Sequence, residues 1–276
     1  QLNGEMEAAA LLPREVPKVP AEWANVQPDA PKAAFTSKRA DLEKFVNTVV
    51  TPTNAMAGDS LPVSAFVDHA DGTFELGAAA YEKRGIAVDI PVWHAENCTQ
   101  CNWCSAVCPH AVIRPFVLSR EDAQASGAAS AELKGDENKR FMIAISAADC
   151  TGCGSCVEMC MARNKALSMQ LSENIMEEQQ RVFDIVKEKA EKDLGSDETL
   201  KDSQFLRPLL EYSGACPGCG ETPYAKLVTQ LFGSRMFIAN ATGCSSIWGC
   251  SAPSTPYTVD EKGRGPAWSN SLFEDN

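Results

Sequence analysis

Two runs of four cysteines constrain this chain more than any other feature of its sequence. The runs are CTQCNWCSAVCP, at residues 98–109, and CTGCGSCVEMC, at residues 150–160. In both runs, successive cysteines lie three, three and four residues apart. Soft thiolates crowded in this way are typical ligands of compact metal–sulfur groups. A fold for this chain must therefore bring eight thiols around such groups.

The spacing predicts two [4Fe–4S] clusters that draw ligands from both runs. Three cysteines within seven residues can surround one cluster, whereas the fourth lies too far along the chain and reaches the neighbouring cluster. We expect one cluster on Cys98, Cys101, Cys104 and Cys160, and a second on Cys108, Cys150, Cys153 and Cys156. Met161 stands where the first run has Pro109, but this difference removes no ligand. Zinc sites use four ligands in two pairs, so a zinc-binding interaction module is the weaker interpretation.

Composition excludes several classes of protein. Ten of the twelve cysteines lie in CxxC-type clusters of a 276-residue chain, which favours metal binding in a reducing compartment over a disulfide scaffold. The formal net charge of −12 argues against nucleic-acid binding. No apolar run predicts a membrane span, and the N-terminus lacks both a secretion signal and an initiator methionine.

A third cysteine group follows the second run. Cys216 and Cys219 form CPGC, and we expect a helix to follow, with Thr222 as its N-cap and Gly233 at its end. Leu227, Val228 and Leu231 form its expected apolar face. Taken alone, CPGC also fits a thioredoxin-like motif or a zinc pair.

Two more cysteines follow the segment RMFIANA, which predicts a buried strand at 235–241. The next residues, TGCSSIWGC, predict a turn that carries Cys244 and Cys250. The third thiol group would then lie at a helix start and a strand end, where open α/β sheets place their ligand sites.

Elsewhere, hydrophobic patterning predicts strands at 111–118 and 140–145 with an exposed loop between them, and a repeat of cluster loop, short helix and strand. Near the N-terminus, Leu42, Phe45, Val46 and Val49 form a helical stripe. A connecting helix is expected over 170–195, with a stripe at Leu171, Ile175, Val182, Ile185 and Leu194.

Trp103 within the first run and His110 just after it are candidate modulators of a cluster. Trp103 has the bulk to keep water from the first cluster, and His110 can donate a hydrogen bond to a sulfur. For His110, an ordinary hydrogen-bonded histidine is the preferred interpretation.

The double run and four further segments resemble the pyruvate:ferredoxin (flavodoxin) oxidoreductase family. These segments are DGTFELGAAAYEKRGIAVDIPVW, ACPGCGETPYAKL, ATGCSSIWG and GRGPAWSNSLFEDN. The resemblance covers roughly residues 37–276 and a central to C-terminal portion of the family, whose members are much longer. It implies oxidative decarboxylation of pyruvate with coenzyme A to acetyl-CoA and CO2. Electrons would pass through three [4Fe–4S] clusters to ferredoxin, flavodoxin or a fused flavoprotein.

The resemblance also implies roles for the third cysteine group. Cys216, Cys219 and Cys244 match ligands of the third cluster, whose fourth ligand would lie outside the sequence or be Cys250. Glu221 and Cys244 match contacts of thiamine diphosphate. The family's GDG motif, which holds Mg²⁺ and the diphosphate, is absent from this sequence. Thiamine diphosphate and Mg²⁺ would therefore be shared with other regions of the enzyme.

We therefore expect an α+β ferredoxin-like two-cluster module followed by part of an α/β thiamine diphosphate-binding domain. The expected parts are a Pro/Ala-rich tether (1–36), a linking segment (37–77), the module (78–169), the connecting helix (170–195) and the partial thiamine domain (196–276). The resemblance implies an incomplete piece of a homodimeric enzyme in the cytoplasm or in an organelle such as the mitochondrion or hydrogenosome. The alternative is a stand-alone polyferredoxin-type electron carrier.

Overall fold

The computed structural model describes residues 39–191, 194–250 and 254–270, which belong to one compact unit spanning 34–276. The tether expected at 1–36 lies outside the described residues. The α-helices are α3 (Ala40–Phe45), α4 (Thr51–Asn54), α5 (Trp103–Ala106), α6 (Arg120–Ser126), α7 (Ser155–Glu158), α8 (Met176–Lys189), α9 (Leu200–Ser203), α10 (Thr222–Phe232) and α11 (Cys244–Cys250). The strands are β1 (Asp89–Trp93), β2 (Ile113–Ser119), β3 (Ala131–Leu133), β4 (Asp136–Ile145), β5 (Leu167–Leu171), β6 (Phe237–Asn240) and β7 (Ala267–Asn270).

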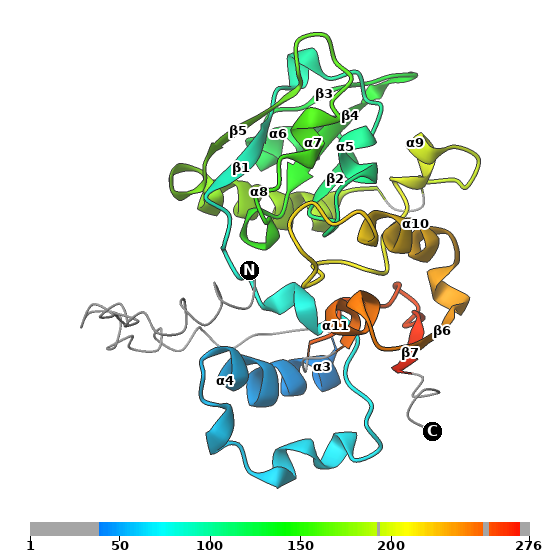
Figure 1. Cartoon of the computed structure of the whole chain (residues 1–276). Helices are drawn as coiled ribbons and strands as arrows, with labels where there is room; N and C mark the ends of the chain where they lie inside the picture. The colour runs from blue at the N-terminus through cyan, green and yellow to red at the C-terminus, as the bar shows by residue number, and fades with distance from the viewer. Residues whose placement is uncertain (1–38, 192–193, 251–253, 271–276) are drawn as a thin grey trace, which may run out of the picture. The chain divides into compact units, whose positions relative to one another are not determined.

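Two antiparallel sheets frame the cysteine runs (Figure 1). The first run lies between β1 and β2, and the second lies between β4 and β5. Strand β1 pairs with β5, and β2 pairs with β4 in the sheet β2-β4-β3. Each run contains a one-turn helix, α5 or α7, and these helices contact each other. The predicted repeat of cluster loop, short helix and strand is therefore present, and its two halves pair into one module.

The helix α8 packs its apolar side against this module. Phe183 and Val186 are buried, and the ring of Phe183 meets that of Phe116 on β2 edge to face, 5.8 Å apart. The prediction of one helix over 170–195, with an apolar stripe from Leu171 to Leu194, was wrong at both ends. Leu171 ends β5 and is half exposed, and Leu194 lies beyond α8. The strand continues to Leu171 because its backbone pairs with Asp89.

The chain between β2 and β4 is more ordered than the loop that the sequence predicted. Ser119 caps α6 by accepting a hydrogen bond from the Asp122 backbone N–H, and Gly127 ends the helix with φ 71°. Ala123 and Ser126 are buried, and β3 then pairs with β4. The sequence predicted an exposed loop here because the segment is rich in small residues. Two of them, Ala123 and Ser126, are buried in α6, and their small size lets this helix pack closely against α8.

The N-terminal stripe forms a small core of its own. The helix α3 continues into a π-helical turn, Val46–Val50, which leads into α4. Leu42, Phe45, Val46 and Val49 are all buried, as the periodicity predicted. They pack with Ala78 in the 3-10 turn Ala78–Tyr81.

The C-terminal part departs from the expected pattern at three places. The helix α10 ends at Gly233 as predicted, but it starts at Thr222, with Glu221 in the capping position. Its buried side is formed by Lys226, Thr229 and Gln230 rather than by the apolar residues. Backbone groups of neighbouring segments bind that side: carbonyls accept hydrogen bonds from Lys226 and Gln230, and a backbone N–H donates to Thr229.

The other two departures follow α10. The strand β6 pairs in parallel with β7, but Phe237 is 90% exposed, so the strand is not buried in this chain. The segment expected to be a turn forms the helix α11, which begins at Cys244. Within it, Trp248 packs with Leu210 and Tyr257 in a third core.

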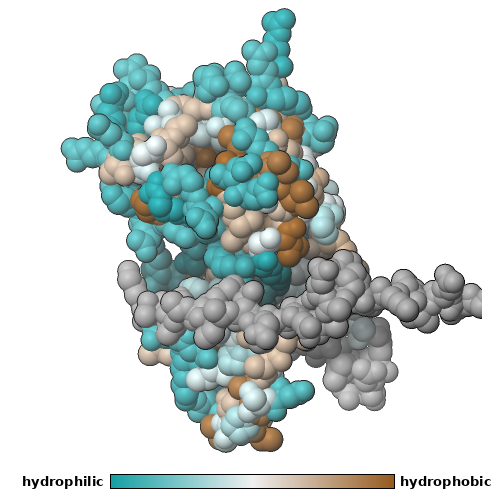
Figure 2. Space-filling view, turned by 90° about the vertical axis from the view of Figure 1, so that its left-hand side faces the viewer, coloured by the Kyte–Doolittle hydropathy of each residue, from teal (hydrophilic) through white to brown (hydrophobic). Residues whose placement is uncertain are grey.

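The surface is mainly hydrophilic on the face shown in Figure 2, where hydrophobic residues gather in a few groups. Among the described residues, no helix has both the length and the apolar character needed to cross a membrane.

Candidate iron–sulfur sites

The structure gathers the eight cysteines of the two runs around two cavities. One cavity is lined by Cys98, Cys101, Cys104 and Cys160. The other is lined by Cys108, Cys150, Cys153 and Cys156. Each cavity thus takes three cysteines from one run and the fourth from the other. This is the grouping that the spacing predicted.

The loops of the two runs have matching backbone geometry. Gln100 and Asn102 adopt φ values of 58° and 61°, and the corresponding Gly152 and Gly154 adopt 69° and 74°. These turns aim the Gln100 N–H at Cys98 Sγ and the Gly152 N–H at Cys150 Sγ, both at 3.4 Å. A backbone donor on the sulfur stabilises a thiolate, which is the form that binds iron.

The remaining cavity walls are mostly apolar. Trp93, Ile143 and Leu167 line the first cavity, and Pro91, Val112 and Met169 are among those lining the second. Trp103, which the sequence suggested as a shield, is 36% exposed and does not line the first cavity. Trp93 takes this place because it ends strand β1, whose partner β5 supplies Leu167.

The donor sets fit iron–sulfur clusters chemically. Burial raises the pKa of the Cys150 thiol to about 12 and raises that of Cys104 as well. Such thiols become thiolates when a cation binds them. In the described residues, no three His, Cys, Asp or Glu side chains stand close enough to hold a single metal ion. Instead, four sulfurs surround each cavity.

The third cysteine group lies next to the second cavity. A Cβ added to Gly218 would be 3.8 Å from both Cys153 Cβ and Ser155 Oγ, so the CPGC loop contacts the second run. Partial burial raises the pKa of Cys219, but hydrogen bonds from the Thr222 and Glu221 backbone outweigh it and lower the pKa below its ordinary value. Neither cavity includes this group.

The expected thiamine contacts occupy the same part of the chain. Cys244 is exposed at the start of α11. Glu221 Oε2 accepts a hydrogen bond from Trp248 Nε1 at 3.4 Å, which ties the start of α10 to α11. The side chain of Cys250 lies outside the described residues.

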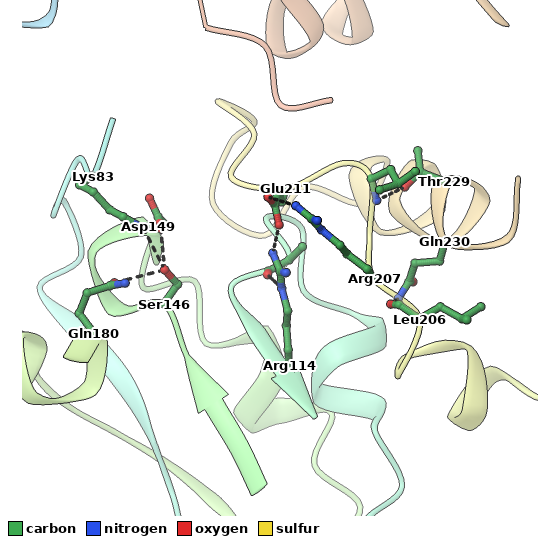
Figure 3. Close-up of polar contacts among 12 residues, drawn as sticks. Lys83, Arg114, Ser146, Asp149, Gln180, Leu206, Arg207, Glu211, Thr229 and Gln230 are labelled. Carbon is green, nitrogen blue, oxygen red and sulfur yellow. Dashed lines mark hydrogen bonds and ion pairs between the residues drawn. The ribbon is translucent and has the colours of Figure 1, made fainter. Parts of the chain in front are cut away.

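A network of buried charges holds the segment that leads to CPGC (Figure 3). Arg114 on β2 donates to Glu211 at 2.5 Å, and both side chains are at least 92% buried. Burial alone would raise the pKa of Glu211, but Lys187, Arg114 and Arg207 lower it to about 2, so Glu211 is a carboxylate at neutral pH. On the other side of this segment, Lys83 donates to Asp149 at 2.5 Å, one residue before Cys150.

His110 contacts the same segment, whose Tyr212 N–H donates to the His110 carbonyl. It is buried, its Nδ1 lies 3.0 Å from the Ser213 carbonyl oxygen, and Arg84 Nη1 donates to that oxygen at 3.5 Å. A carbonyl only accepts, so Nδ1 carries the proton, and the neutral ring leaves Nε2 without one. Burial lowers the pKa of His110, which favours the neutral ring. The ring lines the second cavity, but this tautomer does not suit donation to a sulfur.

Sequence patterns missed one buried cation beside the first run. Lys226 on α10 is 1% exposed, and its Nζ donates to the backbone carbonyls of Ser105 and Ala106 in α5. Burial lowers its pKa to about 8, so the ammonium form still prevails at neutral pH. The one available signal was a lysine beside the expected apolar face of α10.

Comparison with known proteins defines the class of the module. Residues 97–163 match the family described as 4Fe-4S double cluster binding domain. Residues 30–87 match the family EKR, described as a domain of unknown function. The chain therefore contains a 4Fe-4S double cluster binding domain, and the zinc-module interpretation is wrong for this part.

Relatives extend this result to most of the chain. It is 53% identical over 261 residues to a pyruvate-flavodoxin oxidoreductase of Klebsiella pneumoniae, covering 94% of this chain and 22% of that protein. It is 50% identical to the pyruvate:ferredoxin oxidoreductase of Moorella thermoacetica, covering 97% of this chain and 23% of the relative. A mitochondrial pyruvate dehydrogenase [NADP(+)] of Euglena gracilis is 48% identical. The match covers 97% of this chain and 14% of that protein. This chain is thus homologous to one segment of pyruvate-flavodoxin and pyruvate:ferredoxin oxidoreductases, and it spans about a fifth of the length of the first two relatives.

Proposed function

We propose that this chain is the electron-transfer portion of an enzyme that oxidises pyruvate with coenzyme A to acetyl-CoA and CO2. The observation that carries the proposal is the crossed grouping of eight cysteines around two cavities, in a chain about half identical to pyruvate oxidoreductases. The ligands are proposed to be Cys98, Cys101, Cys104 and Cys160 for one cluster, and Cys108, Cys150, Cys153 and Cys156 for the other.

When bound, [4Fe–4S] clusters supply one-electron reduction and oxidation. The chain's own residues hold the sulfurs in place, exclude water with apolar walls, and keep the two sites in one packed module. The contact between Gly218 and Cys153 supports a third site next to the second. Its proposed ligands are Cys216, Cys219 and Cys244, and the fourth is either Cys250 or a residue elsewhere in the enzyme.

The region from residue 196 is proposed to be part of a thiamine diphosphate-binding domain. Glu221 and Cys244 would contact thiamine diphosphate there, with Mg²⁺ held by other regions. Exposed apolar side chains on three neighbouring elements support this incompleteness: Tyr224 on α10 is 74% exposed, Phe237 on β6 is 90% and Ile247 on α11 is 66%. The remainder of a longer enzyme would cover them.

The proposed partners follow from the relatives. Ferredoxin, flavodoxin or a fused flavoprotein would accept the electrons, and the whole enzyme would be a homodimer. Bacterial and mitochondrial relatives support a cytoplasmic or organellar location. The stand-alone electron carrier remains the second candidate, because the two-cluster module has its own core.

A segment exchange separates these candidates. This chain would replace the homologous segment, 53% identical over 261 residues, in the Klebsiella pneumoniae enzyme. With thiamine diphosphate, Mg²⁺ and coenzyme A, we expect pyruvate-dependent reduction of flavodoxin. The control carries Cys98→Ala and Cys160→Ala and should lose this activity. A folded, iron-loaded chimera that cannot use pyruvate would contradict the proposal and favour the stand-alone carrier.

A further inference from the structure

The short helices α5 and α7 occupy equivalent places in the repeat, yet lysines from different sources cap them. At α7, Lys165 Nζ donates to the carbonyls of Val157, Glu158 and Cys160 at 2.9–3.1 Å. Lys165 lies in the same repeat and is exposed. Cations favour the C-terminal carbonyls of a helix because those groups carry partial negative charge.

At α5 the equivalent carbonyls belong to Ser105 and Ala106, each 52 positions earlier in the sequence. The residues between Cys108 and β2 are Pro, His, Ala and Val, so the first repeat supplies no lysine here. Lys226 of α10 donates to both carbonyls instead, from 121 and 120 residues away. A distant helix therefore supplies the cation that the second repeat provides for itself.

The two lysines differ in their surroundings. Lys165 is exposed, so water screens its charge, whereas Lys226 is 1% exposed and α9 contacts α5 nearby. Ser105 Oγ donates to Gln204 Oε1 at 3.1 Å beside it, and Gln204 is 3% exposed. A charge inside the protein acts over a given distance more strongly than one in water.

The two carbonyls that Lys226 contacts, those of Ser105 and Ala106, lie in sequence between one cysteine of each cavity. Cys104, within α5, lines the first cavity, and Cys108, two residues after Ala106, lines the second. Reduction adds negative charge to a cluster, and net charge and hydrogen bonding near the sulfurs set its potential. A buried ammonium at this place stabilises the reduced form of both.

We propose that Lys226 is a positioning residue that fixes the carbonyl end of α5 and, through its buried charge, raises the midpoint potentials of both clusters. The inference rests on the proposed binding of two clusters. It also gives α10, which begins just after the CPGC motif, a direct influence on the electron-transfer module.

The test is a redox titration of the anaerobically reconstituted full chain, followed by electron paramagnetic resonance. In Lys226→Met we expect both midpoints to become more negative, with the redox equilibrium shifted about tenfold or more, which is 59 mV for one electron. Lys226→Arg keeps the positive charge, so its midpoint potentials should stay close to those of the unaltered chain. The matched control, Lys165→Met, removes the exposed cap of α7 and should shift the midpoints less.

The outcomes separate this inference from the proposed function. Absence of iron in the unaltered chain would defeat the proposed function itself. Unchanged midpoints in an iron-loaded Lys226→Met variant, or an equal shift in Lys165→Met, would overturn this inference alone. Lys226→Gln serves as a second neutral variant. Loss of iron from both neutral variants would mean that Lys226 serves assembly rather than the potential, and would also overturn it.

Discussion

Single residues set the path of each cluster loop, and the two runs achieve the same path with different residues. The second run uses Gly152 and Gly154 at its left-handed positions, where a missing Cβ avoids strain. The first run uses Gln100 and Asn102, whose side chains are tied down. Gln100 Nε2 donates to the Glu132 carbonyl at 2.6 Å, and Asn102 Nδ2 donates to the Lys201 carbonyl at 2.9 Å.

Gly152→Ala should weaken the second cluster loop more than Gly154→Ala. An added Cβ at Gly152 would lie 2.9 Å from the Asp89 carbonyl oxygen, whereas one at Gly154 would meet no atom within 4 Å. Both changes carry the strain of a positive φ, about 1 kcal/mol. Gly152→Ala adds an overpacking cost of about 1–3 kcal/mol.

Thermal loss of cluster absorbance measures the difference, with iron content checked at the start. We expect a clearly lower midpoint for Gly152→Ala and a small decrease for Gly154→Ala. Equal midpoints would show that the approach to Asp89 does not constrain the loop.

At the scale of elements, a buried ion pair joins the cluster module to the segment that precedes CPGC. Arg114 lies on β2, and Glu211 lies five residues before Cys216. Removal of one partner of a buried ion pair leaves an uncompensated charge, which is more costly than loss of an exposed pair. This segment therefore depends on Glu211 for its position.

Glu211→Gln is expected to destabilise the folded chain by about 3–5 kcal/mol at neutral pH. The double variant Arg114→Met/Glu211→Gln should recover part of the loss, because the unpaired guanidinium is gone. The control is Glu178→Gln, which removes an exposed pair with Arg181 and should leave the thermal midpoint unchanged. If the thermal midpoint of Glu211→Gln is as little changed as that of the control, the ion pair does not hold the segment in place.

At the scale of the whole molecule, the sequence predicted best what repeated spacing and periodicity control. The cysteine spacing predicted the two groups of four, and hydrophobic patterning located β2 and the buried half of β4. Helix α6 was missed because its signal is a single cap, Ser119, followed by seven residues of which the two buried ones, Ala123 and Ser126, are small.

Partners distant in the sequence explain the remaining failures. The buried side of α10 is polar because the carbonyls that Lys226 contacts lie 120 or more residues away. Periodicity therefore assigned the wrong side of that helix. Strand β6 was expected to be buried, but Phe237 is exposed in a chain that spans about a fifth of its bacterial relatives. No local pattern carries either kind of information.

The central claim is that each cluster takes ligands from both runs, and iron counts on two double variants test it most directly. For the unaltered chain with two clusters, about eight irons and eight acid-labile sulfides are expected. Cys98→Ala/Cys160→Ala removes two ligands of one proposed cluster and should leave the other intact, with about four irons and an unperturbed [4Fe–4S] spectrum. Cys98→Ala/Cys108→Ala removes one ligand from each cluster and should perturb both spectra. The reverse result, with one intact cluster in the second variant and two damaged ones in the first, would contradict the account.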